Sequence, residues 1–325
     1  MANNTNRPYV IGLDLGGTNA VFGIVDKEGN ILAQTSVKTQ LYDTAESFVD
    51  ACVQALQPII AQVGGIEQIY GMGAGAPNAN YYDGTISQAP NIKWAHECVV
   101  PLAQMFSDRL GVKVVLTNDA NAAAMGEMTY GVARGMKHFI MITLGTGVGS
   151  GVVVGGKLVY GHDAFAGELG HVTMVRGDEG RMCGCGRKGC LEAYCSATGV
   201  ARTAREMLEK DSRPSVLRDV KAEDITSYEV YKAAVAGDAI ANDIFQFTGK
   251  MLGEACADFA TFCSPEAFVF FGGLCKSGEL IMKPIREAYD AHVMNVYKGK
   301  AKFLFSSLDG AGAAVLGAAA LGWTV

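Results

Sequence analysis

The sequence predicts an α/β fold built from two related halves. Two segments of similar sequence begin at residues 11 and 140, and each consists of an apolar run, a Gly/Thr turn and a second apolar run, which is typical of a β-hairpin. Between these hairpins, strand patterns alternate with helix patterns, which indicates layered α/β structure. At 325 residues the chain is long enough for about two domains, each with its own core.

Each expected element follows from a hydrophobic period or an apolar run. The helices expected from a period near 3.6 residues cover residues 44–63, 120–130, 190–209, 227–236, 239–262 and 311–323. The strands expected outside the two hairpins cover residues 68–76, 113–117 and 267–271. The last helix has about 13 residues, fewer than the roughly 20 that cross a bilayer, so it is expected to pack inside the protein.

The overall charge argues against nucleic acid and membrane partners. The chain has 27 Lys and Arg against 33 Asp and Glu, a net charge of −6, so it has no positive field to attract phosphate backbones or anionic lipid. Residues 1–8 are polar and lack the apolar segment of a signal peptide. We therefore expect a cytoplasmic protein that works on small molecules.

Two glycine-rich turns, residues 14–19 and 144–149, are candidate phosphate-binding loops. Glycine adopts positive φ angles that aim successive N–H groups at an anion, so these turns are expected to form anion-binding nests. An ordinary hairpin turn is the alternative for either one, but two matched nests are what a polyphosphate with its metal ion requires. Neither turn reads G-x-x-x-x-G-K-[ST], and no G-x-G-x-x-G opens a helix, which excludes P-loop and dinucleotide folds.

A third glycine-rich segment follows the strand expected over residues 267–271. Small residues there would let an adenine ring or a ribose lie against the backbone, and a simple turn is equally compatible. The candidate nucleotide-binding residues are therefore Asp14, Gly16, Gly17, Thr18, Asn19, Thr143, Gly145, Thr146, Gly147, Gly272 and Gly273.

Two aspartates lie at the ends of expected strands. Asp14 opens the first glycine turn, where a carboxylate either holds Mg²⁺ through water near the phosphates or caps its own turn. Asp119 lies where the strand over residues 113–117 passes to a helix. Either Asn118 or Asp119 would be a normal helix N-cap there, but an aspartate at this edge can also accept the proton of an attacking hydroxyl in phosphoryl transfer.

Three cysteines and one histidine have the composition of a structural zinc site. Cys183, Cys185 and Cys190 follow His171, and glycines between the thiols let the backbone wrap around a metal ion. A redox dithiol is the rival interpretation, but Cys183 and Cys185 are separated by one residue rather than two. Four protein ligands leave no position for water, so this zinc is expected to organise a loop rather than to catalyse hydrolysis. The remaining cysteines, all expected in the core, are Cys52, Cys98, Cys195, Cys256, Cys263 and Cys275.

The order of these motifs resembles the ROK (repressor, open reading frame, kinase) family, and within it the bacterial glucokinases. Residues 14–18 resemble the first phosphate motif of the family, residues 116–124 its catalytic segment, and residues 143–149 its second phosphate motif. Residues 167–171 and 183–192 resemble its sugar and zinc signature. The resemblance covers nearly the whole chain and implies a duplicated, actin-like, ribonuclease-H-type fold of two lobes, with an interdomain cleft that closes over sugar and ATP.

The resemblance also implies roles for individual residues. Asp119 corresponds to the base that activates the 6-hydroxyl of the sugar. The sequence departs from the family at Asn19, where lysine is frequent, and at Ser150, where glycine is usual. The residues that the resemblance places at the other sugar hydroxyls are Asn91, Asn118, Glu168, His171 and Glu192.

We therefore expect an ATP-dependent kinase that converts D-glucose to glucose 6-phosphate, with Mg²⁺ carried by the nucleotide and Zn²⁺ bound structurally. N-acetylmannosamine, N-acetylglucosamine, mannose and fructose remain alternative substrates, because the same carboxylates contact hydroxyls common to several hexoses. A sugar-sensing regulator of the ROK type is a further alternative, although only eight residues precede the first expected strand, too few for a DNA-binding helix-turn-helix.

The expected domain boundary lies near residue 121. Residues 1–121 together with 310–325 are expected to form a smaller N-terminal lobe, and residues 122–309 a larger lobe with the zinc site and the nucleotide-binding elements. A homodimer is expected, because it is the commonest closed assembly.

Overall fold

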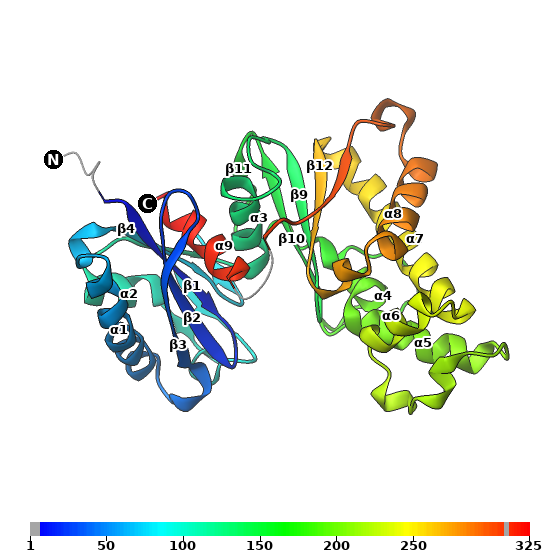
Figure 1. The fold of residues 1–325 in the computed structure, drawn as a ribbon, viewed down its shortest axis with the longest axis horizontal. Helices are drawn as coiled ribbons and strands as arrows, with labels where there is room; N and C mark the ends of the chain where they lie inside the picture. The colour runs from blue at the N-terminus through cyan, green and yellow to red at the C-terminus, as the bar shows by residue number, and fades with distance from the viewer. Residues whose placement is uncertain (1–6, 309–311) are drawn as a thin grey trace. The chain divides into compact units, whose positions relative to one another are not determined.

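The computed structural model describes residues 7–308 and 312–325 and has a mixed α/β architecture, as predicted (Figure 1). The chain forms two compact units, each with its own core. The first unit comprises residues 1–136, 157–167 and 306–325, and the second comprises residues 137–156 and 168–305.

The first unit is organised around a five-stranded sheet with the order β3-β2-β1-β4-β8. Its strands are β1 (Tyr9–Leu15), β2 (Asn19–Val25), β3 (Ile31–Lys38), β4 (Ile69–Gly75) and β8 (Val114–Thr117). A smaller sheet contains β5 (Ala79–Asn80), β6 (Thr85–Ser87) and β7 (Val99–Val100). Strands β1 and β2 form the predicted antiparallel hairpin, and β1, β4 and β8 are parallel, so their carboxyl ends share one edge.

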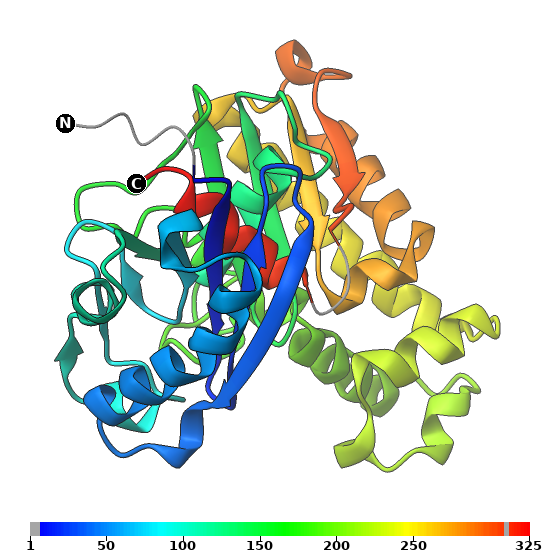
Figure 2. The same ribbon diagram turned by 60° about the vertical axis from the view of Figure 1, so that its left-hand side comes forward.

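Helices cover both faces of this sheet (Figure 2). They are α1 (Ala45–Gln62), α2 (Leu102–Leu110), α3 (Asp119–Thr129) and α9 (Ala313–Gly322). Successive side chains of β1 point to opposite faces: Ile11 joins the core that α1 covers, whereas Val10 packs with Val315 of α9. A Cβ atom at Gly73 of β4 would lie 2.0 Å from the carbonyl oxygen of Ala318, so α9 packs directly on the backbone of the strands.

The second unit repeats this arrangement with a sheet of order β11-β10-β9-β12-β13. Its strands are β9 (Phe139–Leu144), β10 (Val148–Val154), β12 (Ala267–Phe271) and β13 (Lys302–Phe305). The edge strand β11 (Lys157–Leu158) pairs with β10 but begins the segment 157–167 that is counted with the first unit. Its helices are α4 (Glu192–Cys195), α5 (Ala197–Lys210), α6 (Ser227–Val235), α7 (Ala239–Cys263) and α8 (Glu279–His292). The antiparallel pair β9–β10 is the second predicted hairpin, and the parallel pairing of β9 with β12 extends it as β4 extends the first.

The structure corrects two expectations about individual residues. The helix predicted over residues 190–209 is two helices, because Ser196 has an extended backbone and its hydroxyl caps α5 by accepting the N–H of Gly199 at 3.0 Å. Cys98, predicted in the core, is exposed, whereas Cys52, Cys195 and Cys256 are buried.

The contacts of α3 divide the chain differently from the expected boundary near residue 121. That boundary cuts through α3, which packs on α9 and stays in the first unit with the residues up to 136. The expected start of the returning segment, residue 310, lies outside the described residues. In the part of the chain that is described, no helix combines the length and the apolar character needed to span a membrane.

Candidate active site

The carboxyl edge of the first sheet brings the two predicted aspartates together. Asp14 of β1 is in register with Gly75 of β4, and Gly75 is in register with Thr117 of β8. After Asn118, Asp119 begins α3. A Cβ atom at Gly75 would lie 3.8 Å from the Cα of Asp119, so the strand between the aspartates carries no side chain at this point.

Asn118 and Asp119 have different roles at the start of α3. Asn118 is the N-cap, and its Oδ1 accepts the N–H of Asn121 at 2.7 Å. Asp119 is exposed, and its Oδ1 accepts the N–H of Ala120 at 2.8 Å. Because Asn118 caps the helix, Asp119 is not needed as the cap. Its exposed carboxylate is therefore accessible to a ligand.

The carboxylate of Asp14 is half-buried and lies near a second negative charge. Burial raises the pKa of Asp14, and the charge of Asp119 raises it further. A cation bound at this edge would oppose both effects.

We expect Asp14→Asn to raise the melting temperature of the free protein at pH 7. The pKa of Asp14 is higher in the folded than in the unfolded state, so its ionisation at neutral pH favours unfolding. The advantage of the variant should shrink as the pH falls through the folded-state pKa, below which Asp14 is protonated in the wild type. Thermal melts of both proteins between pH 7 and about pH 4 check this. Equal melting temperatures at pH 7 would contradict it.

The glycines of the first turn do not adopt the positive φ angles that we expected. Gly16 and Gly17 both have negative φ, and the turn is closed by the Gly16 N–H, which donates to the carbonyl of Asn19 at 2.9 Å. A Cβ atom at Gly17 would lie 2.7 Å from the Cβ of Asn91. The predicted left-handed nest is therefore wrong here, and the close approach of Asn91 explains the glycine. The neighbouring Thr18 is exposed, as Asn19 is.

The second turn is held by the start of α5. The Gly145 N–H donates to the carbonyl of Gly147 at 3.0 Å, and neither glycine has a positive φ, so the nest prediction is wrong here too. The N–H of Ala197 donates to the carbonyl of Gly145 at 2.8 Å. The hydroxyl of Thr198 donates to the carbonyl of Thr146 at 3.0 Å. The turn is thus fixed by one bond within its own backbone and by two bonds from the start of α5.

The predicted third glycine segment lies beside this second turn. Phe271 at the end of β12 is in register with Thr143 of β9. Gly272 has a φ of 112°, and a Cβ atom there would lie 2.4 Å from the carbonyl oxygen of Leu144. Gly273 has open space around its Cβ position. These residues therefore share one edge of the second sheet with the second turn.

Glu192 connects the second turn with the cysteine loop. Its Oε2 accepts the N–H of Val148 at 2.9 Å, and a Cβ atom at Gly147 would lie 2.4 Å from the same oxygen. Its Oε1 lies 3.5 Å from the Sγ of Cys183, which donates to it. The space that this carboxylate occupies explains why residue 147 is glycine.

The predicted metal-ligating residues His171, Cys183, Cys185 and Cys190 form one cluster. Their ligand atoms all lie within 4.8 Å of one another. The Sγ of Cys183 is 3.7 Å from the Nδ1 of His171, and the Sγ atoms of Cys185 and Cys190 are also 3.7 Å apart. Zn–S bonds of about 2.3 Å place tetrahedral ligands about 3.8 Å apart. The donor set and its spacing therefore fit a zinc ion.

The predicted sugar-binding residues are divided between the units. Asn91, Asn118 and Asp119 belong to the first unit, whereas Glu168, His171 and Glu192 belong to the second. Within the second unit, Glu168 is exposed and directly precedes the single 3₁₀ turn that ends at His171. The Leu169 N–H of that turn donates to the hydroxyl of Ser150 at 3.1 Å, so the departure from glycine at this position supplies an anchor for the segment.

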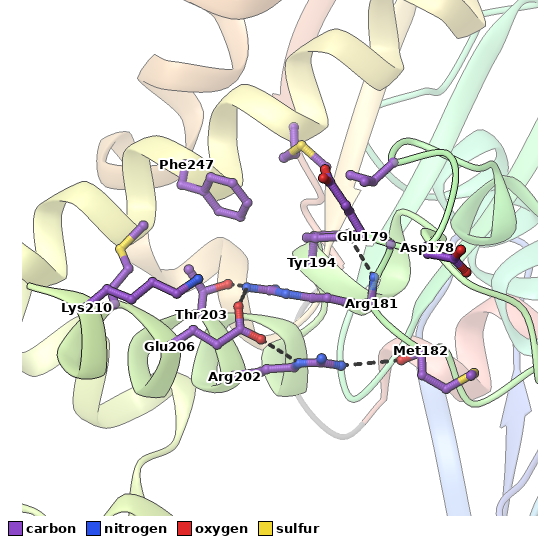
Figure 3. Close-up of a pocket in the computed structure, with 14 residues that line it drawn as sticks. Asp178, Glu179, Arg181, Met182, Tyr194, Arg202, Thr203, Glu206, Lys210 and Phe247 are labelled. Carbon is purple, nitrogen blue, oxygen red and sulfur yellow. Dashed lines mark hydrogen bonds and ion pairs between the residues drawn. The ribbon is translucent and has the colours of Figure 1, made fainter.

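A cavity of about 700 Å³ lies beside the cysteine loop and contains a buried arginine that sequence reasoning missed (Figure 3). The guanidinium of Arg181 pairs with Glu206 at 2.6 Å and donates to the hydroxyl of Thr203 at 2.9 Å. It also lies 4.6 Å from the centre of the Tyr194 ring. These contacts fix the loop that leads to Cys183 against α5. A lone arginine gives no sequence signal of such a role.

Known proteins resemble this chain along most of its length. Glucokinase from Streptomyces coelicolor is 39% identical over 284 residues, which is 86% of each chain. The crystal structure of a ROK family glucokinase from Streptomyces griseus in complex with glucose and AMPPNP is 36% identical, with a TM-score of 0.76, and the match covers 98% of this chain and 100% of that one. A putative xylose repressor from Caldicellulosiruptor is 27% identical over 285 residues, which is 87% of this chain and 70% of the repressor.

The likeness to the Streptomyces griseus structure confirms the duplicated, two-lobed, actin-like fold that the sequence resemblance implied. The family model described as ROK family matches residues 10–324. The chain therefore belongs to the ROK family.

Proposed function

We propose that the protein is an ATP-dependent hexose kinase that phosphorylates the 6-hydroxyl of D-glucose. The observation that carries the proposal is the accessible carboxylate of Asp119 at the carboxyl edge of the first sheet, on the same edge as Asp14. Glucokinases at 36% and 39% identity support the choice of sugar, and the complex with glucose and AMPPNP supports the choice of phosphoryl donor.

Asp119 acts as the general base. Its carboxylate takes the proton of the sugar hydroxyl while the sugar oxygen attacks the γ-phosphorus of ATP. A bond forms between that oxygen and phosphorus, the bond from phosphorus to the bridging oxygen breaks, and ADP leaves. The Ala120 N–H holds Oδ1, which leaves Oδ2 to receive the proton.

The other polar residues recognise the pattern of sugar hydroxyls. The Oδ1 of Asn118 is occupied by its capping bond, so its side-chain NH₂ is the group that donates to a sugar oxygen. Asn91, Glu168, His171 and Glu192 supply further donors and acceptors. A site with several such groups penalises a sugar that leaves them unpaired, which gives selectivity among hexoses.

Although the two glycine turns form no nests, the second turn and the segment at Gly272 share one edge of the second sheet, and we assign the nucleotide to these segments and to the first turn. Two metal ions fit the residues present. Mg²⁺ fits beside Asp14, because burial and the charge of Asp119 both disfavour the ionised form of this side chain and a cation would offset both. When bound, Mg²⁺ would neutralise phosphate charge. Zn²⁺ fits the cluster of His171, Cys183, Cys185 and Cys190. With Nδ1 of His171 directed at the cysteines, the opposite ring nitrogen has a fixed direction toward a ligand.

A panel of hexoses assayed with ATP and Mg²⁺ by coupled ADP release tests the proposal. We expect the highest kcat/KM for D-glucose, with mannose, fructose, N-acetylglucosamine and N-acetylmannosamine as the comparison. A higher kcat/KM for one of these sugars would support a kinase whose substrate is that sugar rather than D-glucose. The likeness to a repressor makes a sugar sensor the second candidate. Glucose binding by calorimetry without any sugar-dependent ADP release would favour that sensor and refute the kinase.

A further inference from the structure

Two glutamates that the proposed reaction does not use lie where the chain passes between its units. The chain first leaves the first unit at residues 136 and 137 and finally returns to it at residues 305 and 306. Glu127 lies near the end of α3, and Glu266 directly precedes β12. Both bind the ends of residues 132–138, which we call the connector.

Glu127 holds the connector at its first-unit end. This residue is 1% exposed, and its Oε2 accepts the N–H of Val132 at 2.8 Å. Its Oε1 accepts the hydroxyl of Ser306 and the N–H of Leu308, the latter at 3.3 Å. A Cβ atom at Gly131 would lie 2.0 Å from Oε2, so a larger residue there would displace the carboxylate. One buried carboxylate therefore binds both the connector and the returning segment.

Glu266 holds the connector at its second-unit end. Its Oε1 accepts the N–H groups of Lys137 at 2.8 Å and of His138 at 3.0 Å. Its own N–H donates to the carbonyl of His138 at 2.7 Å, and its carbonyl accepts the N–H of Lys302 at 2.9 Å. The bond from the Lys137 amide lowers the pKa of Glu266, so the carboxylate is ionised at neutral pH. This glutamate, too, binds the connector and the strand that leads to the returning segment.

The residues between the two glutamates are suited to backbone rotation. Gly135 has a φ of +85°, and a Cβ atom there would meet nothing within 4 Å. Two backbone bonds within this segment are local: the N–H of Met136 donates to the carbonyl of Ala133 at 2.9 Å, and the N–H of Arg134 donates to the carbonyl of Gly131 at 3.2 Å. A few residues that absorb changes in φ and ψ between two fixed ends are what a hinge requires.

We propose that Glu127 and Glu266 are positioning residues that fix the two ends of the connector and, at this crossing between the units, confine backbone rotation to residues 133–136. The link to catalysis rests on the proposed function. Because Glu127 lies on the helix that begins with Asp119, a loosened connector also loosens the alignment of Asp119 with the phosphoryl donor. Neither glutamate touches substrate, and both act through the connector.

The first test is hydrogen exchange in the full chain without ligand. We expect Glu127→Gln and Glu266→Gln each to speed exchange in peptides that cover residues 131–138 by about tenfold or more, because an amide accepts fewer of these bonds than a carboxylate does. Asp26→Asn is the matched control, since Asp26 accepts the N–H groups of Glu28 and Asn30 within one unit. Connector exchange that both variants leave at the wild-type rate would overturn the proposal.

The second test is kinetic and separates positioning from stability alone. We expect both variants to lose about tenfold in kcat for the hexose, with zinc content unchanged and with KM changed less than kcat. Faster connector exchange with wild-type kcat and KM would overturn the positioning role. Because Glu127 is buried, Ser306→Ala gives a milder variant that removes one donor to the same carboxylate, and a smaller loss of kcat is expected. If it matches the wild type in both measurements, the role of Glu127 is refuted.

The two proposals fail in different ways. A wild-type chain with no sugar-dependent ADP release refutes the proposed function, while the exchange experiment still decides whether the two glutamates fix the connector. An active wild type whose glutamate variants are equally active refutes only the inference about the connector.

Discussion

Asp119→Asn is expected to lower the kcat for hexose phosphorylation by about 10²- to 10⁴-fold, which is the usual contribution of a general base. The amide keeps the shape of the side chain, and its oxygen can still accept the N–H of Ala120, but it cannot take up a proton. Sugar binding should be partly retained, because other residues contact the hydroxyls. Coupled ADP release gives kcat, and calorimetry gives the Kd for glucose.

Asp238→Asn is the matched control for this variant. Asp238 also stands at a helix start, where it caps α7 and accepts the N–H of Ala241 at 3.0 Å. It lies outside the candidate active site, so its kcat should stay within about twofold of the wild type. If Asp119→Asn also kept its kcat within about twofold of the wild type, the carboxylate of Asp119 would serve the helix start rather than the reaction.

Cys185→Ser is expected to release the zinc and to lower the melting temperature by about 10 °C. A metal present at about 1,000 times its Kd stabilises the folded state by about 4 kcal/mol, and each kcal/mol shifts the melting temperature of a unit of this size by about 2–4 °C. Cys185 is exposed, so the substitution removes a ligand without leaving a cavity in the core. Metal emission spectroscopy and thermal melts provide the two measurements.

The exposed Cys98 offers the control for the loss of a thiol, because it lies outside the cluster. Cys98→Ser should keep both the metal and the melting temperature of the wild type. Less than about half an equivalent of zinc in the wild type itself would contradict the zinc site, as would full zinc content in Cys185→Ser. The loss of zinc should also lower sugar affinity, because His171 contributes to both sites.

Elements with strong local signals were predictable from the sequence. Helix α1 begins after the cap Thr44 and has apolar residues at helical spacing, so its predicted and observed bounds nearly coincide. Strand β12 has the predicted bounds because an apolar run ends at glycine. Helix α8 was missed, although its buried residues Ile281, Ile285 and Ala288 have helical spacing. The short α2 follows Pro101 and was also missed.

The candidate site shows a similar division between local and distant information. The cysteine cluster was predictable because its residue types and spacing carry the chemistry. The reason for the glycines could not be predicted from the sequence. Gly17 makes room for Asn91 and Gly147 makes room for Glu192, and both partners are far away in sequence. The role of Glu127 depends on Ser306, which is 179 residues away, and no local pattern reports such a contact.

The position of α9 bears on the order in which the units mature during translation. Its residues 313–322 cover the backbone of β1 and β4 at Gly12 and Gly73, although those strands are synthesised near the start of the chain. A ribosome that has just made β13 has synthesised every strand of both sheets, yet α9, which covers this face of the first sheet, is still to be made. The first unit therefore cannot complete its packing until α9 has been made, so this apolar sheet face stays uncovered through most of synthesis and is a surface for chaperones to protect.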